Sequence, residues 1–253
     1  MNKYVKNFLY SRGFNVTRIT KDLNKPVELS DEENEIIHYV RSNNLSMCTT
    51  INLQQTAVAA KYIAINNIPG DFVECGVFRG GNALIAAKIF QIHNLTKKVY
   101  LFDTFTGMTE PTRHDLRTSS QSPMTNKYLK QKRESYTDWA YASIEKVKEN
   151  FLKCNLLTSN VVFVKGKVED TLDQESNIPN TISFLRLDTD WYESTRKELE
   201  KLWEKLVPGG ILVVDDYGCF DGARKAFNEY FEKHSPPPFL SLIDDGARIG
   251  VKT

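Results

Sequence analysis

Short apolar runs alternate with segments of helical spacing along most of the chain. Five of these runs have strand length and are rich in β-branched residues; they lie within 71–81, 98–103, 160–165, 181–192 and 210–217. Helical signals are a Ser30 cap with acidic residues after it and a helix through Val40, then 54–66, 82–90, 141–152, 194–206 and 223–233. Strands that alternate with helices usually form parallel sheets. The pattern therefore predicts an α/β protein with a mostly parallel sheet.

The two ends of the chain add to this sheet. Two apolar segments, 239–243 and 248–251, follow the last helix and have the length and position of an antiparallel hairpin. With them the sheet is predicted to have seven strands. Aromatic and basic residues alternate from Tyr4 to Phe14, which indicates an arm that packs on the domain or on another subunit. We therefore expect one domain, 1–253, with an N-terminal arm and helices in 1–66 and the core in 71–253.

Two predicted strands end in pairs of acids. Asp188 and Asp190 follow one apolar run, and Asp215 and Asp216 follow the next. If these strands are parallel neighbours, the four carboxylates meet at the carboxyl edge of the sheet, where α/β proteins place ligands. Unpaired carboxylates this close repel and raise one another's pKa, unless a cation neutralises them or one of them holds a proton. Capping of the following helices could explain any one of these acids but does not easily explain all four. The pattern predicts a divalent metal site.

A glycine-rich turn follows the first predicted strand. Gly76, Gly80 and Gly81 let the backbone approach a ligand closely. Asp103 ends the next strand 27 positions after Gly76, near the spacing of a carboxylate that holds a ribose. Glu74 lies just before the turn, where a buried carboxylate is costly unless it meets a cation such as a sulfonium. These residues favour S-adenosylmethionine over a nicotinamide cofactor.

Composition narrows the class of protein. The chain has 253 residues, of which 41% are hydrophobic, which suits one large α/β domain. A formal net charge of +1 provides no field that would attract nucleic acid or an anionic membrane, so neither is expected as a partner. The four cysteines are widely spaced, and no apolar run approaches the ~20 residues of a membrane span. A cytoplasmic protein with free thiols is the expectation.

One segment lacks a clear pattern. The stretch 104–139 is long and polar, and a connection of this length inside a compact domain is usually functional or locally disordered. We interpret it as a lid over the site. His114 belongs to it and is the one histidine placed to touch a substrate.

Five blocks of the chain resemble, in order and spacing, the macrocin-O-methyltransferase family. They are Val73-Glu-Cys-Gly-Val-Phe-Arg-Gly-Gly81, Leu101-Phe-Asp-Thr-Phe-Thr-Gly107, Lys165-Gly-Lys-Val-Glu-Asp-Thr-Leu172, Leu185-Arg-Leu-Asp-Thr-Asp-Trp-Tyr-Glu-Ser-Thr195 and Val207-Pro-Gly-Gly-Ile-Leu-Val-Val-Asp-Asp-Tyr-Gly218. The resemblance implies a Rossmann-like class I S-adenosylmethionine-dependent methyltransferase that methylates a sugar hydroxyl with Mg²⁺.

The resemblance also implies roles for particular residues. Mg²⁺ would be held by Asp188, Asp215 and Asp216, with Asp190 as the general base. Glu74, Gly76, Gly80 and Asp103 would line the cofactor, and Gly166, Val168, Glu169 and Asp170 would surround its adenine. Met47 and Thr49 would lie near its methionine end. A sugar-containing small molecule is the expected acceptor, and a homo-oligomer is compatible with the family.

Three alternatives stay open at this point. A metal-dependent methyltransferase could act on a catechol or another phenol, because two adjacent hydroxyls also chelate a metal. The chain could bind S-adenosylmethionine without catalysis, although four intact acids argue against this. A nicotinamide-dependent oxidoreductase is the most distant alternative.

Overall fold

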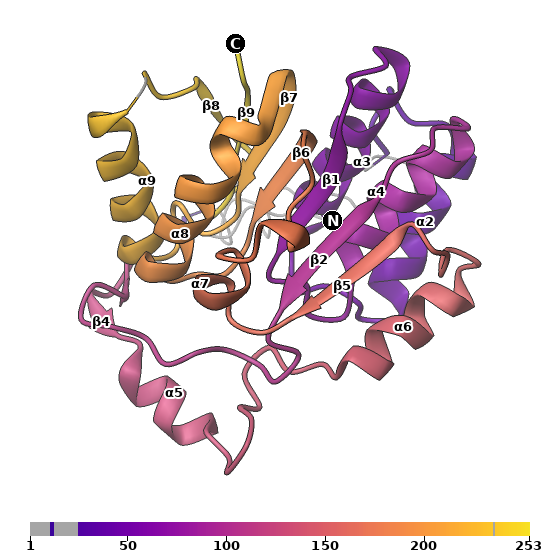
Figure 1. Cartoon of the computed structure of the whole chain (residues 1–253). Helices are drawn as coiled ribbons and strands as arrows, with labels where there is room; N and C mark the ends of the chain where they lie inside the picture. The colour runs from indigo at the N-terminus through magenta and orange to yellow at the C-terminus, as the bar shows by residue number, and fades with distance from the viewer. Residues whose placement is uncertain (1–10, 13–24, 235) are drawn as a thin grey trace.

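The computed structural model describes residues 11–12, 25–234 and 236–253. Most of the predicted arm from Tyr4 to Phe14 therefore lies outside the described residues. In the part that is described, two helices come first, and the helices and strands that follow form a three-layer α/β arrangement with them (Figure 1).

The central sheet has seven strands in the order β5-β2-β1-β6-β7-β9-β8. Their bounds are Asp71–Cys75 (β1), Val99–Asp103 (β2), Val161–Lys165 (β5), Ile182–Leu187 (β6), Leu206–Val214 (β7), Leu240–Leu242 (β8) and Arg248–Val251 (β9). The first five strands in this spatial order are parallel, and β9 and β8 form the antiparallel end. The predicted seven-stranded sheet and its terminal hairpin are confirmed.

Helices cover both faces of the sheet (Figure 1). One face carries α2 (Asp31–Ser42), α3 (Thr50–Ile65), α4 (Gly81–Ile92) and α6 (Ile144–Lys153). The other carries α7 (Val168–Thr171), α8 (Tyr192–Leu202) and α9 (Asp221–Lys233). Both layers pack on strands whose side chains are buried on each side, so the strands read as nearly continuous apolar runs.

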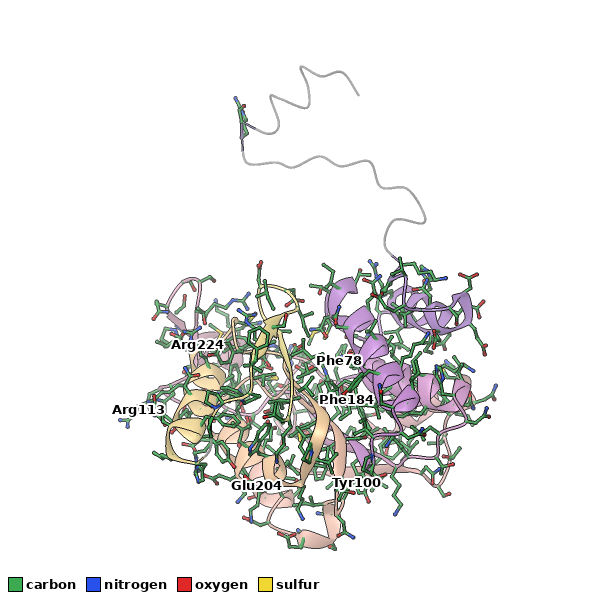
Figure 2. The ribbon with its side chains drawn as sticks, turned by 90° about the horizontal axis from the view of Figure 1, so that it is seen from above. Phe78, Tyr100, Arg113, Phe184, Glu204 and Arg224 are labelled. Carbon is green, nitrogen blue, oxygen red and sulfur yellow. The ribbon has the colours of Figure 1, made fainter. Side chains whose placement is uncertain are left out.

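Alternate residues of each strand point to opposite layers. Phe72 and Phe184 face the first layer, where their rings make an edge-on contact with centroids 5.1 Å apart. Val73 and Leu185 face the second layer. Phe184 lies in the interior in Figure 2, and it is fully buried. Burial of such a side chain contributes about 1.5–3 kcal/mol to folding.

Some element boundaries differ from the prediction for local reasons. Helix α3 begins at Thr50 rather than at residue 54, because the Thr49 hydroxyl accepts a hydrogen bond from the Asn52 amide and caps the helix. Helix α8 ends at Leu202 and a 3₁₀ turn, Trp203–Lys205, follows it. Leu206 then pairs with Ile182, so β7 starts inside the predicted helix 194–206.

The polar segment 104–139 contains short elements that the sequence pattern did not predict. They are β3 (Leu116–Arg117), β4 (Ser122–Pro123) and α5 (Thr125–Gln131), the last of which projects from the body of the molecule (Figure 1). Asp115 is fully buried and its carboxylate accepts a hydrogen bond of 2.8 Å from the Tyr192 amide at the start of α8. This bond ties the segment to the loop that carries Asp188 and Asp190.

Candidate active site

The acid-tipped strands are neighbours, as predicted. The register aligns Cys75 of β1 with Leu187 of β6, and Leu187 with Val214 of β7. The Asp188 amide donates to the Cys75 carbonyl and the Asp215 amide to the Leu187 carbonyl, each at 2.9 Å. These ladder bonds bring all four acids to the carboxyl edge of the sheet.

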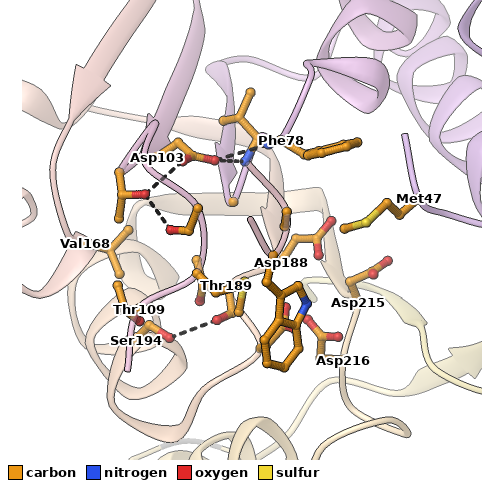
Figure 3. A pocket seen from close by; sticks show the side chains of 18 of the residues that line it. Met47, Phe78, Asp103, Thr109, Val168, Asp188, Thr189, Ser194, Asp215 and Asp216 are labelled. Carbon is orange, nitrogen blue, oxygen red and sulfur yellow. Dashed lines mark hydrogen bonds between the residues drawn. The ribbon is translucent and has the colours of Figure 1, made fainter. Parts of the chain in front are cut away.

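A cavity of about 350 Å³ opens at this edge. The predicted site residues that line it are Met47, Glu74, Gly76, Asp103, Gly166, Val168, Glu169, Asp188, Asp190, Asp215 and Asp216. Figure 3 shows Asp103 and Val168 on one side of this pocket and Asp215 and Asp216 on the other. The glycine turn and the acid cluster therefore belong to one cavity.

Three predicted cofactor residues do not line the cavity. Thr49 uses its hydroxyl to cap α3. Gly80 adopts a left-handed conformation, φ +88°, as the N-cap of α4. Asp170 is exposed in α7. The structure gives each of these residues a local role in a helix or at the surface, and none of them reaches the cavity.

Gly76 is required by a close approach of two strands. Its φ is +85°, and a Cβ atom at this position would lie 1.8 Å from the Asp188 carbonyl oxygen. Only glycine avoids this clash with the backbone of the acid-bearing loop. The absence of a side chain at Gly76 therefore lets the glycine-rich turn pack directly against the loop that carries Asp188.

Asp103 organises the glycine turn. One of its carboxylate oxygens accepts hydrogen bonds from the Val77 and Phe78 amides at 2.7 and 3.1 Å, and the other accepts from the Phe105 amide at 2.7 Å. Burial raises the pKa of Asp103, and these amides partly offset the shift. The carboxylate expected to hold a ribose is therefore also bonded to the backbone of the loop around it.

The acids form two overlapping groups of ligand atoms that lie within 4.8 Å of one another. One group is Asp188, Asp190 and Asp216, and the other is Cys48, Asp188 and Asp215. Asp216 is buried, and its Oδ2 atom has no hydrogen-bond partner among the described residues. A set of carboxylate oxygens with an orphaned buried atom suits a hard cation such as Mg²⁺.

Asp190 joins the first group through an unusual backbone. Its φ is +68°, a left-handed conformation that aspartate adopts only at some cost. The turn brings one of its carboxylate oxygens within 4.8 Å of an oxygen of Asp188 and of an oxygen of Asp216. Sequence reasoning set Asp190 apart from the three metal ligands, whereas the structure places it beside two of them.

Sequence reasoning missed the cation beneath the cluster. Arg186 is fully buried in β6, and its Nη2 atom donates to Asp188 at 2.8 Å and to Asp215 at 2.6 Å. Its Nε atom lies 3.3 Å from Glu74 Oε1 across the β1–β6 pair. An arginine inside an apolar strand was the available signal, because a guanidinium is buried only with partners.

Burial dominates the electrostatics of the carboxylates. It raises the pKa of Asp188, Asp190 and Asp216 well above the ordinary value, and neighbouring carboxylates raise it further. Burial also raises the pKa of Glu74 to about 8, although Arg186 opposes this shift. The cation that Glu74 needs is thus supplied partly by the protein, while its Oε2 atom has no hydrogen-bond partner in the described structure.

A further part of the cavity lining was not predicted as part of the site. It contains Trp139 and Phe220 with two basic residues of the polar segment, Arg117 and Lys127. His114, the histidine expected to touch a substrate, does not line this cavity; its ring contacts that of Tyr192 at a tilted angle, with centroids 4.7 Å apart. Only the position of 104–139 beside the site could be anticipated.

The family model for macrocin-O-methyltransferase (TylF) matches residues 16–248. The chain belongs to the macrocin-O-methyltransferase family. It is 30% identical over 205 residues to the 8-demethyl-8-(2,3-dimethoxy-alpha-L-rhamnosyl)-tetracenomycin-C 4'-O-methyltransferase of Streptomyces olivaceus, which covers 81% of this chain and 70% of that protein. It is 28% identical over 245 residues to the mycinamicin III 3''-O-methyltransferase of Micromonospora griseorubida, covering 96% and 91%.

A solved structure agrees with this assignment. The O-methyltransferase NovP is similar with a TM-score of 0.72 and 28% identity, and the match covers 82% of each chain. This member of the macrocin-O-methyltransferase family is therefore an O-methyltransferase with the class I fold of S-adenosylmethionine-dependent enzymes. Within the described ranges, no helix has the length and apolar character needed to span a bilayer.

Proposed function

We propose that the enzyme transfers a methyl group from S-adenosylmethionine to a hydroxyl of a sugar or a glycosylated metabolite, with Mg²⁺ at the acid cluster. The observation that supports this most is the convergence of four carboxylates and the glycine turn in one cavity. The relative from Streptomyces olivaceus is named for methylation of a compound that carries a rhamnosyl group.

The residues present fit both bound groups. Asp188, Asp215 and Asp216 would hold the cation; Asp188 is shared by the two close groups of ligand atoms, one of which contains Asp215 and the other Asp216. The Lewis acidity of the cation would lower the pKa of an acceptor hydroxyl. S-adenosylmethionine would supply the methyl group, and its sulfonium suits the carboxylate of Glu74. Gly76 keeps the cofactor turn and the acid loop in contact, since any side chain there would separate them.

Asp190 is proposed as the general base. It lies at the acid cluster, and burial raises its pKa, which makes it a stronger base than an exposed aspartate. In the reaction the hydroxyl oxygen forms a bond to the methyl carbon and the carbon–sulfur bond breaks, with its electron pair going to sulfur. The proton of the hydroxyl passes to Asp190.

Metal removal tests this proposal. Methyl transfer to a panel of glycosides and phenols should stop in EDTA and return with added Mg²⁺, and Asp188→Ala should show the same loss without recovery. Asp173→Asn is a suitable control, because Asp173 is exposed, pairs only with surface lysines and does not line the cavity. Full activity in EDTA would contradict the metal role, and exclusive methylation of phenols would contradict the sugar assignment.

A further inference from the structure

Two basic side chains line the same cavity as the acid cluster. Arg117 belongs to β3 and Lys127 to α5, so both come from the segment 104–139. Asp190 acts electrostatically on the Lys127 ammonium, and so does Arg117. The two cations and the proposed base therefore share one part of the cavity.

These cations differ from their neighbours in having no acidic partner. Lys132 in the same segment pairs with Glu110 at 3.7 Å, and Arg133 pairs with Asp138. Among the ion pairs of the described residues, none within 4 Å involves Arg117 or Lys127. A cation that faces a cavity without a carboxylate is available to an anionic ligand.

Aromatic rings support both cations instead. The Lys127 ammonium lies 3.6 Å from the centroid of the Trp139 ring, and the Arg117 guanidinium lies 5.5 Å from that of Phe220. Trp191 contacts both rings edge-on, with centroids 5.4 Å from Trp139 and 5.2 Å from Phe220. Both residues are exposed, and their cationic groups lie against one aromatic cluster, which favours a defined position for each.

This aromatic cluster is fixed to the catalytic loop. Trp191 directly follows Asp190 and is 2% exposed, and its indole N–H donates to the Thr109 carbonyl at 3.0 Å. A ligand group bound by Arg117 and Lys127 would therefore have a defined position relative to Asp190. We assign such a group to the acceptor, because Lys127 interacts with Asp190, the proposed base, whereas the glycine turn of the cofactor bonds Asp103.

We propose that Arg117 and Lys127 bind a phosphoryl group carried by the acceptor, so that the substrate is a phosphorylated sugar rather than a neutral glycoside. Two unpaired cations balance a group with about two negative charges, and the guanidinium can bond two of its oxygens. A sugar carboxylate would supply only one charge. This inference rests on the proposed function and specifies its substrate class.

Binding can be measured without catalysis. Isothermal titration of the protein saturated with S-adenosylhomocysteine would use glucose 1-phosphate, UDP-glucose, glucuronate and methyl glucoside as probes. EDTA is present throughout, so that a divalent cation at the acid cluster cannot bind the phosphate. We expect both phosphorylated probes to bind at least about 10-fold more tightly than glucuronate and methyl glucoside. UDP-glucose binding more tightly than glucose 1-phosphate would identify a nucleotide sugar, and equal binding a simple sugar phosphate.

Variants locate the interaction. Arg117→Gln and Lys127→Gln should each weaken binding of the phosphorylated probes by about 10- to 100-fold, and Lys127→Arg should restore most of it. Arg113→Gln and Lys130→Gln are matched controls: both residues are exposed in the same segment and neither lines the cavity, and Arg113 lies at the molecular edge in Figure 2. Unchanged affinity for S-adenosylhomocysteine would show that the variants fold.

The outcomes separate this inference from the proposed function. Equal binding of phosphorylated and neutral probes, or wild-type binding by both glutamine variants, overturns the phosphoryl site. Preferred binding of glucuronate overturns it in favour of a carboxylate. If neutral glycosides are methylated and the variants act on them normally, the proposed function stands and this inference fails. If no acceptor is methylated but the phosphorylated probes bind through these cations, the phosphoryl site stands and the proposed function fails.

Discussion

The two walls of the cavity are built by different means. The strand wall carries Asp188 and Asp215, whose positions follow from the register of β1, β6 and β7. The part of the lining formed by the segment 104–139, called the lid wall below, carries Arg117 and Lys127. Their positions follow from an aromatic cluster formed by residues distant in the sequence. Backbone pairing between strands thus positions the acidic residues, whereas the packing of aromatic side chains positions the basic residues.

The walls also differ in how charge is compensated. Arg186 lies beneath the strand wall and bonds two of its carboxylates. The cations of the lid wall have aromatic rings beneath them and no carboxylate within 4 Å among the described ion pairs. A wall with internal counter-charge can be rigid before ligands bind, while a wall with unpaired charge gains its partner from the ligand. Catalysis should therefore depend most on the strand wall and selectivity on the lid.

The largest effect is expected from Asp190→Asn. If Asp190 is the general base, as we propose, this variant should have a kcat about 100- to 10,000-fold lower, because an amide cannot take the proton. The affinity for S-adenosylhomocysteine should stay within about threefold, since Asp190 lies with the acid cluster rather than the cofactor turn. Steady-state kinetics with calorimetric binding tests both statements.

The same variant decides between two roles for Asp190. If Asp190 acts only as base, Mn²⁺ binding followed by electron paramagnetic resonance should change by less than about threefold. A large loss of Mn²⁺ affinity would instead make Asp190 a metal ligand, in line with its position beside Asp188 and Asp216. Asp215→Asn is the matched comparison, because Asp215 belongs to the same cluster and is a proposed metal ligand, and its carboxylate accepts a hydrogen bond from Arg186.

Arg186→Met tests the internal compensation of the strand wall. Removing the guanidinium leaves Glu74, Asp188 and Asp215 without their shared cation, so the free energy of unfolding should fall by about 3–5 kcal/mol. Urea denaturation in EDTA measures this. Arg196→Met is the control, because Arg196 makes two ion pairs at the surface and should matter by less than about 1 kcal/mol. Equal losses in the two variants would deny Arg186 its special role.

Trp139→Ala tests the lid wall. Loss of the ring beneath Lys127 should raise the acceptor KM at least about 10-fold through the displaced ammonium, while the affinity for S-adenosylhomocysteine changes little. Tyr141→Ala provides a control, since Tyr141 is exposed, its ring contacts that of Tyr136 at a tilted angle, and it does not line the cavity. A weaker cofactor affinity with unchanged acceptor KM would show that this wall serves the cofactor.

Sequence reasoning reached the strand wall because its signals are local. Apolar runs, a turn glycine and acids at strand ends predict the edge of the sheet where Asp188 and Asp215 lie. Parallel pairing of neighbouring strands then brings these two acids together. Boundaries were less accurate where a tertiary contact prevailed, as at Leu206, whose pairing with Ile182 extends β7 into a predicted helix. Element type was thus easier to predict than element length.

The lid wall and Arg186 could not be predicted for a physical reason. The positions of Lys127 and Arg117 depend on Trp139, Trp191 and Phe220, and nothing in a single sequence states that these rings meet. Arg186 was visible as a charge in an apolar strand, but its partners come from three other elements. Contacts between side chains of distant segments can be identified only from a three-dimensional structure, even where the fold itself can be predicted from the sequence.

Glu33 is a buried carboxylate that, unlike Glu74 and Asp216, has hydrogen-bond partners for both of its oxygens. Glu33 is 1% exposed and bonds Ser30, Lys61 and His93, and these partners overcome the opposing effect of burial and lower its pKa from 4.5 to about 2. A depressed pKa contributes stability that is present above pH 4.5 and is lost as the pH falls toward 2. Glu33→Gln should therefore lower the free energy of unfolding by about 1–3 kcal/mol at pH 7, and this difference from wild type should shrink through that window. Urea titrations at a series of pH values measure it. A difference that stays constant down to acidic pH would mean that Glu33 acts through packing rather than through its charge.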